Sequence, residues 1–280
     1  MKIGLSSLLF LQVSFEEALS CLNNLGVDCM EILFDSPHFP PEFDMKRLGG
    51  LRKIIDSYNL DVSVHSSYGD INPASYYKEI RALALQQTKK SIDACRILGG
   101  DVVVMHVGRC PMPEIKALFS MTKNLFLNIA SKCLDYAKKR EVKLTLENFP
   151  IPAEYPCSHP KQLIGLTRKM DGLGITYDVG HAFIEKCRAK MKNPEQKIIE
   201  DIKQIGKSLS HVHFHDNHGI RDEHLPLGFG DINFKPIIKT LKEINYSGKI
   251  VLELWYPRLK KPMKVGRDSL KKVRELLKVS

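Results

Sequence analysis

The chain has 280 residues, of which 43% are hydrophobic and 26% are charged, an ordinary composition for a globular protein. No window approaches the roughly 18 consecutive apolar residues that a membrane-spanning helix needs, which excludes an integral helical membrane protein. The formal net charge is +10, which suits a polyanion or a phosphorylated substrate as partner. Much of that charge lies in residues 256–278, a segment that is also typical of a solvated helix face.

The N-terminus and the cysteines indicate where the protein resides. The apolar stretch near the N-terminus soon meets Glu16 and Glu17 and lacks a small-residue cleavage site, so it predicts a strand and a helix start rather than a signal peptide. The seven cysteines are scattered and never form a Cys-x-x-Cys pair, which argues against a disulfide framework and a thiolate zinc site. We therefore expect a cytoplasmic protein.

Short runs of β-branched and aliphatic residues recur along the whole chain and predict eight strands. In chain order these are residues 2–7, 29–35, 61–67, 101–108, 143–149, 174–180, 209–216 and 249–255. Their starts lie 27 to 42 residues apart. This spacing is the length of one strand, one helix and two loops.

The spacers between these runs have helical patterns. Residues 14–26 begin with a serine and end with a glycine, which are the signals of a capped helix. Residues 76–100 and 117–140 carry apolar side chains at intervals of three and four, as one face of a helix does. Residues 266–279 supply the eighth helix.

No linker, low-complexity tract or break in composition divides the chain. We therefore predict an α/β protein with one domain, residues 1–280, in which eight strand–helix units close into a parallel (β/α)8 TIM barrel. A doubly wound open sheet is the alternative. Such a sheet would more often carry a glycine-rich phosphate loop after its first strand, and residues 4–10, GLSSLLF, are not one.

The barrel prediction gives a common position to residues that can bind metals, because active sites of such barrels lie at the carboxyl ends of the strands. Imidazole and carboxylate groups fall near that end of six consecutive strands, the third to the eighth. They are His65, His106, Glu147, Asp178, His181, His213, Asp222, His224 and Glu253. A single strand-end histidine is more often an ordinary polar residue, but nine such residues at one rim predict a metal site.

This set resembles the metal ligands of the xylose isomerase-like TIM barrel superfamily (AP endonuclease family 2), which includes endonuclease IV and many sugar isomerases and epimerases. The similarity spans essentially the whole chain. Four positions resemble ligands common to the superfamily: Glu147 in LEN, Asp178 in YDVGH, His213 in VHFHD and Glu253 in LEL. Five more resemble ligands of endonuclease IV: His65, His106, His181, Asp222 and His224. The resemblance implies two to three zinc or manganese ions, with Glu147 bridging two of them.

Five of the ten histidines fall within the fourteen residues HVHFHDNHGIRDEH. Because side chains alternate along a strand, His211, His213 and His215 share one direction. We expect them to fill different layers of the barrel, so that only His213 reaches the metals. His218 is expected in a loop, and Asp216 is expected to orient a ligand histidine.

One chemistry that such a site supports is metal-assisted hydrolysis of a phosphoester, either abasic-site DNA or a smaller phosphodiester. Glu147 and Asp178 would position the nucleophile. Tyr68, in an H-x-S-Y pattern that endonuclease IV also has, would lie beside the opened DNA strand. The positive net charge is compatible with DNA.

The alternative chemistry is isomerisation or epimerisation of a small sugar or sugar phosphate, with one ion at the four superfamily positions. Glu147 and Glu253 would then move a proton to and from carbon as general base and acid. His181 and Arg221 would contact the substrate, and Tyr68 or His65 would shape the pocket.

The ligand set and the loops favour different answers. An isomerase has no need of His65, His106 or the Asp-x-His pair, which favours hydrolysis. However, residues 35–44 lack the DNA-binding segment of endonuclease IV, residues 69–75 lack its apolar wedge, and residues 224–234 are of a type common in sugar isomerase-like proteins. A phosphodiesterase or phosphatase acting on a small substrate reconciles these features. A metal-binding protein without catalytic activity is a third, less supported interpretation.

Overall fold

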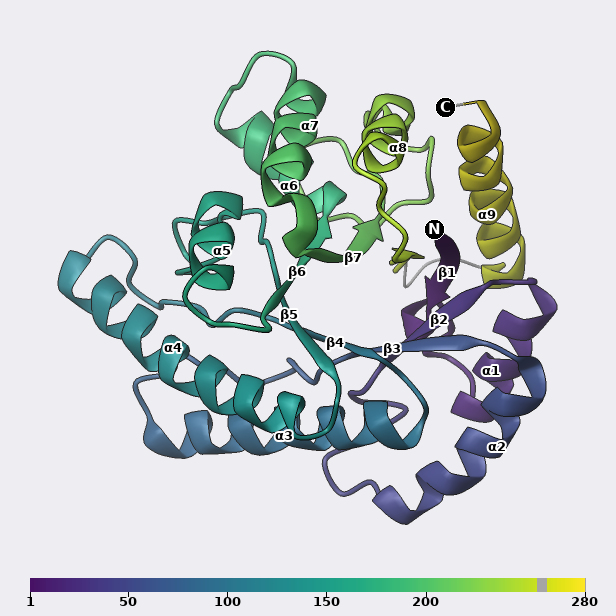
Figure 1. Ribbon diagram of the computed structural model, residues 1–280, viewed down its shortest axis with the longest axis horizontal. Coiled ribbons are helices and arrows are strands. Elements are labelled where there is room, and N and C mark those ends of the chain that lie inside the picture. Colours follow the sequence, from purple (N-terminus) through teal and green to yellow (C-terminus); the bar gives the residue numbers. More distant parts are fainter. Residues whose placement is uncertain (256–260, 280) are drawn as a thin grey trace.

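The protein is a closed barrel of parallel strands surrounded by helices (Figure 1). The computed structural model describes residues 1–255 and 261–279. Eight strands pair in chain order, and the last pairs with the first. They are β1 Lys2–Ser6, β2 Cys29–Leu33, β3 Asp61–His65, β4 Val102–Met105, β5 Lys143–Glu147, β6 Gly174–Asp178, β7 Leu209–Phe214 and β8 Lys249–Leu252. The predicted (β/α)8 architecture is therefore confirmed.

Nine α-helices lie outside the barrel in the part of the chain that the structure describes. They are α1 Phe15–Asn24, α2 Leu48–Tyr58, α3 Lys78–Ile97, α4 Lys116–Lys138, α5 Pro160–Thr167, α6 Val179–Arg188, α7 Pro194–Ile205, α8 Phe234–Glu243 and α9 Pro262–Val279. The two long helices α3 and α4 lie side by side (Figure 1), and α9 packs against β1. None of these helices is long and apolar enough to cross a membrane.

The helix boundaries follow local signals. Helix α1 begins after Ser14, whose hydroxyl accepts a hydrogen bond from the backbone N–H of Glu17 at 3.2 Å, as the predicted cap requires. The spacer between β6 and β7 contains two helices, α6 and α7, where one strand–helix unit was predicted. The second helix begins at Pro194, whose fixed φ suits the first turn of a helix, after Asn193 in a left-handed conformation.

The predicted strands run past the observed ones at their carboxyl ends. Residues 101–108 were predicted as a strand, but only Val102–Met105 pair in the sheet, and residues 249–255 shorten to Lys249–Leu252. The remaining residues lie beyond the ends of the strands at the rim. His106 and Glu253 lie in these segments, so the shortening places them at the mouth of the barrel.

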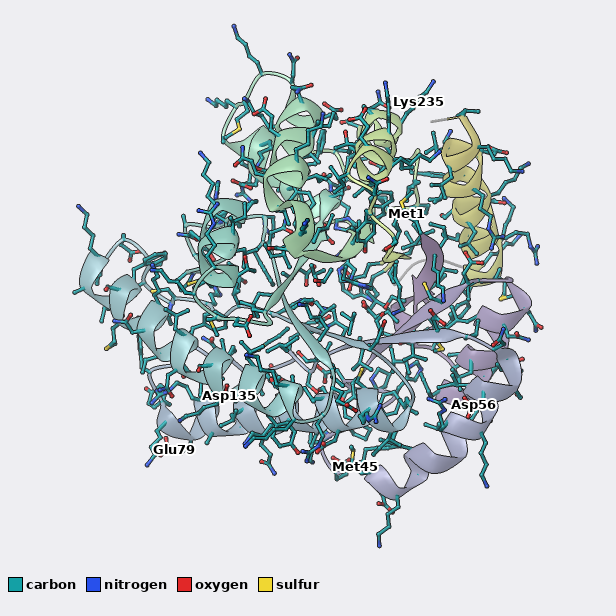
Figure 2. The ribbon with its side chains drawn as sticks, in the orientation of Figure 1. Met1, Met45, Asp56, Glu79, Asp135 and Lys235 are labelled. Carbon is teal, nitrogen blue, oxygen red and sulfur yellow. The ribbon has the colours of Figure 1, made fainter. Side chains whose placement is uncertain are left out.

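The strands and helices bury different amounts of their surface. Strand residues such as Val102–Val104 are buried, as expected for strands covered by side chains inside and helices outside. Helix α8 buries one face, including Ile237 and Leu241. Charged side chains such as Asp56 and Glu79 point away from the barrel (Figure 2). Removal of the apolar faces from water drives the ring of helices onto the barrel.

Polar side chains in the barrel bond to one another rather than remain unpaired. The hydroxyls of Thr145 on β5 and Thr176 on β6 lie 2.6 Å apart, and Ser63 on β3 donates to Glu31 Oε2 on β2 at 3.1 Å. Buried polar groups are costly without such partners. These pairs form a polar interior beneath the carboxyl end of the barrel.

Candidate metal centre

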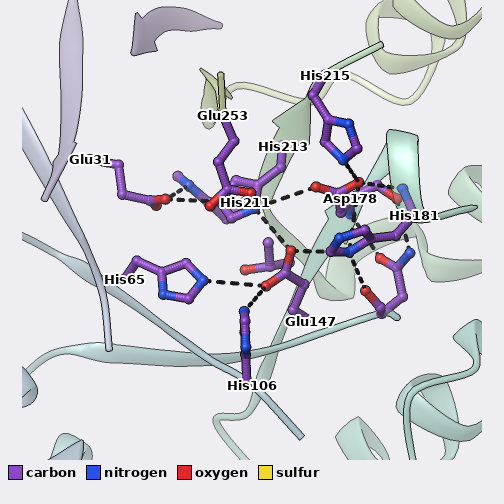
Figure 3. A network of polar contacts seen from close by, with 12 residues as sticks. Glu31, His65, His106, Glu147, Asp178, His181, His211, His213, His215 and Glu253 are labelled. Carbon is purple, nitrogen blue, oxygen red and sulfur yellow. Dashed lines mark hydrogen bonds and ion pairs between the residues drawn. The ribbon is translucent and has the colours of Figure 1, made fainter. Parts of the chain in front are cut away.

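The nine residues predicted as metal ligands all lie at the carboxyl end of the barrel, and Figure 3 shows most of them converging around Glu147. Strands β3, β5 and β6 end with His65, Glu147 and Asp178, and the last residue but one of β7 is His213. Strands β4 and β8 are followed directly by His106 and Glu253. The first turn of α6 contains His181, and the loop after β7 contains Asp222 and His224. Six consecutive strands therefore contribute to one cluster.

Glu147 is the centre of the cluster, and its side chain is fully buried. Its Oε2 atom lies 3.1 Å from Nε2 of His106 and 3.5 Å from Nε2 of His65. Its Oε1 atom lies 3.1 Å from Nδ1 of His213. The two oxygens therefore face two different groups of ligand-type atoms (Figure 3), as the oxygens of a bridging carboxylate do.

The group around His213 contains three carboxylates. Glu147, Asp178, His213 and Glu253 are buried, and one ligand-type atom from each lies within 4.8 Å of all the others. Nδ1 of His213 is 3.5 Å from Glu253 Oε2 and 3.8 Å from Asp178 Oδ2. Oxygen and imidazole ligands in this proportion suit zinc, manganese or cobalt.

A further group lies where α6 meets the loop after β7. Nε2 of His181 is 3.1 Å from Asp222 Oδ2, and Nε2 of His224 is 3.3 Å from Asp222 Oδ1. Asp178 caps α6, and its Oδ1 accepts the backbone N–H of His181 at 2.6 Å. The Asp-x-x-His spacing thus follows from helix-cap geometry, and the cap joins this group to the one around His213.

Three histidines are held in one tautomer by the main chain. Nδ1 of His65, His181 and His224 lies 3.0, 2.9 and 2.7 Å from main-chain carbonyl oxygens. A carbonyl oxygen only accepts hydrogen bonds, so Nδ1 is the donor, and a neutral imidazole then presents the lone pair of Nε2. Each of these Nε2 atoms faces a carboxylate of the cluster.

The buried charges shift one another's pKa values. Burial raises the pKa of Glu147, but the surrounding histidines, chiefly His213, bring it well below its usual value. Burial lowers the pKa values of His213 and His181, but the neighbouring carboxylates raise both well above the ordinary value. The pKa of His224 is raised to about 9 because Asp222 outweighs its burial. The carboxylates of the cluster therefore stabilise a positive charge at the neighbouring positions, whether it is carried by a protonated histidine or by a bound cation.

Glu31, in the middle of β2, was not among the predicted site residues. Its Oε1 is 3.1 Å from Nε2 of His213, and its Oε2 is 2.8 Å from Nε2 of His211. All three side chains are fully buried. A glutamate inside the apolar run CMEILF is the signal that could have identified it, because a buried carboxylate requires charged or hydrogen-bonding partners.

The prediction that only His213 of its strand reaches the cluster is wrong for His215. Strand β7 ends at Phe214, so the alternation on which that prediction depended stops there. Nε2 of His215 lies 3.2 Å from Asp178 Oδ1 and 3.5 Å from Asp222 Oδ1. His215 therefore joins the group formed by His181, Asp222 and His224.

Asp216 does not orient a histidine, contrary to prediction. Its carboxylate accepts the backbone N–H groups of Asn217, Gly228 and Ile232 at 2.9, 2.8 and 3.1 Å. It therefore fixes both ends of the loop that carries Asp222 and His224. His218 is exposed in that loop, as predicted.

A cavity of about 810 Å³ opens onto the cluster. Its lining includes five of the predicted ligands, His106, His181, Asp222, His224 and Glu253. Tyr68 also lines the cavity, and its ring stacks on His106 with the centroids 4.6 Å apart. Arg221, predicted to contact the substrate, is exposed and is not among the described residues that line the cavity.

Comparisons with known proteins agree with this geometry. A family model described as "Xylose isomerase-like TIM barrel" matches residues 20–276. An uncharacterised protein of Methanocaldococcus jannaschii is 33% identical over 255 residues, which are 90% of this chain and 83% of that one. A probable endonuclease 4 of Petrotoga mobilis is 26% identical over 251 residues, 84% of either chain. A solved structure described as a D-tagatose 3-epimerase-like protein superimposes with a TM-score of 0.83 and 30% identity, covering 100% of both chains.

Proposed function

The chain belongs to the xylose isomerase-like TIM barrel family, and from this membership and the geometry of the rim we propose that it is a metal-dependent hydrolase of small phosphoesters. The observation that carries the proposal is the bridging position of Glu147 between two groups of ligand-type atoms. Relatives in this family include a probable endonuclease and an epimerase-like protein. The choice between hydrolysis and epimerisation therefore depends on the residues of the site itself.

The residues at the rim fit divalent cations. His65, His181 and His224 each direct Nε2 at a carboxylate oxygen 3.1 to 3.5 Å away. Either a proton on Nε2, which the raised pKa values of His181 and His224 favour, or a metal cation between the two atoms satisfies both of them. Glu147 Oε2 and Asp178 Oδ2 are buried without a hydrogen-bond partner among the described residues. Buried ionised oxygens without a partner are very costly, and a coordinated cation removes that cost.

Three positions follow from the groups of donor atoms. His65, His106 and Glu147 would hold the first ion, and Glu147, Asp178, His213 and Glu253 would hold the second. His181, Asp222 and His224 would hold the third. The many imidazoles favour zinc, while the carboxylates also admit manganese.

Bound ions of this kind would lower the pKa of water and neutralise the charge that develops on a phosphoryl group. The residues of the chain supply position and proton transfer. The backbone N–H of His181 fixes Asp178 through Oδ1, so Oδ2 is directed at the second position. Oε1 of Glu147 and Oε2 of Glu253 both lie near Nδ1 of His213, at 3.1 and 3.5 Å, and would orient the water beside it. Tyr68 forms the adjacent wall of the cavity.

The cavity favours a small substrate over duplex DNA. Its volume of about 810 Å³ is within the range of small-molecule pockets. Among the described lining residues, Arg109 is the one Lys or Arg, and its guanidinium already pairs with Glu154 at 3.0 Å. Duplex DNA binding depends on several Lys or Arg contacts to phosphates. We therefore place the metal ions, rather than basic side chains, as the main determinant of phosphate binding.

Sugar epimerisation is the second candidate function. The 30% identity to a D-tagatose 3-epimerase-like protein supports it, as does the convergence of Glu147 and Glu253 on Nδ1 of His213. In that case the two glutamates act as general base and general acid on one carbon atom. This chemistry requires the second metal position alone.

The two functions are distinguished by activity assays on zinc- and manganese-loaded protein. Hydrolysis of bis-p-nitrophenyl phosphate and of an abasic-site oligonucleotide is measured beside deuterium exchange into ketohexoses. We expect turnover of the small phosphodiester to fall in His106→Ala by more than the roughly 10–100-fold that loss of an outer partner of a ligand causes, and to be unchanged in the control His218→Ala. Deuterium exchange that survives His106→Ala, without phosphodiester turnover, would establish the epimerase instead.

A further inference from the structure

His215 is a buried histidine to which the site as described so far gives no function. It follows β7 directly, and its side chain is 0% exposed. Neither ring nitrogen forms a hydrogen bond with a described residue, although Nε2 lies 3.2 Å from Asp178 Oδ1. A buried polar group without a partner costs about 1–3 kcal/mol, so the position is costly unless the ring binds something.

The unpartnered Nε2 atom is directed at the group of His181, Asp222 and His224 (Figure 3 shows His215 beside Asp178 and His181). One ligand-type atom from each of these four residues lies within 4.8 Å of all the others. The Nε2 atoms of His181, His215 and His224 lie 3.1, 3.5 and 3.3 Å from oxygens of Asp222. In a tetrahedral zinc site with bonds of about 2.0–2.1 Å, neighbouring ligand atoms are roughly 3.3–3.4 Å apart. The separations of His215 and His224 from Oδ1, and of His181 from Oδ2, are each close to an edge of such a tetrahedron.

The neighbouring helix leaves room for this ring. A Cβ atom on Gly180, in the first turn of α6, would lie 2.1 Å from Cε1 of His215 and 2.3 Å from its Nε2. The backbone of Gly180 is helical, without a positive φ, so its conformation does not require glycine. The space that the His215 ring occupies does require it.

We propose that His215 is the fourth protein ligand of the third metal position, which becomes a His₃Asp zinc site with no open coordination position. This inference rests on the metal centre of the proposed function. A zinc site with four protein ligands is typically structural, whereas catalytic sites keep one position for water or substrate. The third ion therefore ties α6, the end of β7 and the following loop together, and only the first two ions meet the substrate.

The loop supports a structural role for this ion. Asp222 and His224 lie on the loop whose two ends Asp216 fixes through three backbone N–H groups. Nδ1 of His224 donates to the carbonyl oxygen of Glu253 at 2.7 Å. The ion would therefore also hold the main chain that carries Glu253, a ligand of the second position.

The direct test is a crystal structure of the zinc-loaded protein with anomalous data at the zinc edge. We expect Nε2 of His215 at about 2.0–2.1 Å from the third ion, and neither water nor added phosphate bound to that ion. A third ion with water as its fourth ligand, and a His215 ring that contacts Asp178 alone, would overturn the proposal. Two occupied positions and an empty third would overturn it and leave the hydrolase proposal intact. No bound zinc at any position would overturn both.

Zinc affinity in solution distinguishes a direct ligand from an outer partner of Asp178. His215→Ala removes the ligand, and Gly180→Ala displaces the ring while keeping the histidine. We expect the affinity for one of the three zinc ions to fall in both variants by more than the roughly 10–100-fold that loss of an outer partner causes. Competition with a chelator measures this affinity. The exposed His218→Ala is the matched control and retains all three affinities. If all three zinc affinities are unchanged in both His215→Ala and Gly180→Ala, His215 is not a ligand of the third ion. This test does not depend on crystals.

Discussion

At the level of single residues, the direction of each imidazole determines what the rim can bind. Main-chain carbonyl groups hold the Nδ1 atoms of His65, His181 and His224, and so the Nε2 atoms are directed inward without any metal. His213 differs because both of its nitrogens face carboxylates, Glu147 on one side and Glu31 on the other. Orientation of metal ligands by outer partners is general in metalloproteins, and here it identifies Glu31 as a positioning residue.

The effect of Glu31 on His213 can be measured. Burial raises the pKa of Glu31, but His213 and His211 bring it well below its usual value, so the side chain is ionised at neutral pH. Glu31→Gln removes the charge and keeps the shape. We expect zinc at the second position to bind about 10–100-fold more weakly, as measured by competition with a fluorescent chelator.

A control for that variant is available on the neighbouring strand. Ser63 donates to Glu31 Oε2 at 3.1 Å, whereas His213 lies at Oε1. Ser63→Ala should therefore leave the zinc affinity nearly unchanged. If Glu31→Gln binds zinc as tightly as the wild type does, the positioning role of Glu31 is wrong.

Residue patterns predicted part of the site, for physical reasons. Asp-x-x-His was recognisable because a helix cap fixes Asp178 and His181 three residues apart. Glu31 was not identified, because a lone glutamate in an apolar strand does not reveal which face of the barrel it occupies or which residue it meets. His215 was assigned to the wrong layer because the sequence does not show that β7 ends at Phe214.

At the level of secondary-structure elements, α6 connects the candidate site with the outer layer. Its first turn contains His181 and Gly180, and its second half contains Lys186, which is only 2% exposed. Nζ of Lys186 lies 2.9 Å from Glu185 Oε2 and 2.8 Å from Asp201 Oδ2 of α7. This buried ion pair fixes α6 against α7, and therefore fixes the base on which His181 is held.

Removal of this cation should destabilise the protein strongly. Lys186→Met leaves the carboxylates of Glu185 and Asp201 without the buried cation that they share, which costs about 3–5 kcal/mol of unfolding free energy at pH 7. Urea denaturation measures this difference. Lys197→Met is the control, because Lys197 forms an exposed pair with Glu200 and exposed pairs contribute little. If Lys186→Met unfolds at the same urea concentration as Lys197→Met, the buried ion pair of Lys186 does not stabilise the protein as described.

The same variant has a defined pH dependence. Burial raises the pKa of Glu185, but His159 and Lys186 lower it below the ordinary value of 4.5. A depressed pKa in the folded state stabilises the protein above the unfolded-state value, and this stabilisation is lost as the pH falls through the folded-state value. The difference between wild type and Lys186→Met should therefore narrow when urea titrations are repeated below pH 4.5. A difference that widens there would be inconsistent with this pairing.

The elements themselves were largely predictable. Apolar runs of β-branched residues at regular spacing predicted all eight strands, because strands covered on both faces have to be apolar almost throughout. Their carboxyl ends were less predictable, because His106 and Glu253 continue the predicted runs but lie just beyond the last residues of β4 and β8. The separation of α6 from α7 depends on the left-handed Asn193 before Pro194, a local conformation that periodicity does not reveal.

At the scale of the whole molecule, closure of the barrel brings together residues that are far apart in the sequence. His65 and Glu253 are 188 positions apart in the chain, yet both lie within one cluster because β1 pairs with β8 and every strand runs in the same direction. The fold was therefore enough to predict a shared rim. It did not predict the substrate, because the loops that form the cavity obey no such regular pattern.

The central claim is that this rim holds several metal ions, and elemental mass spectrometry of the purified protein tests it most directly. The wild type is compared with His224→Ala, which removes a residue of the third position alone. The account predicts two to three equivalents of zinc or manganese per chain in the wild type and about one fewer in the variant. A single equivalent that is unchanged in His224→Ala would contradict the account and favour a mononuclear sugar epimerase.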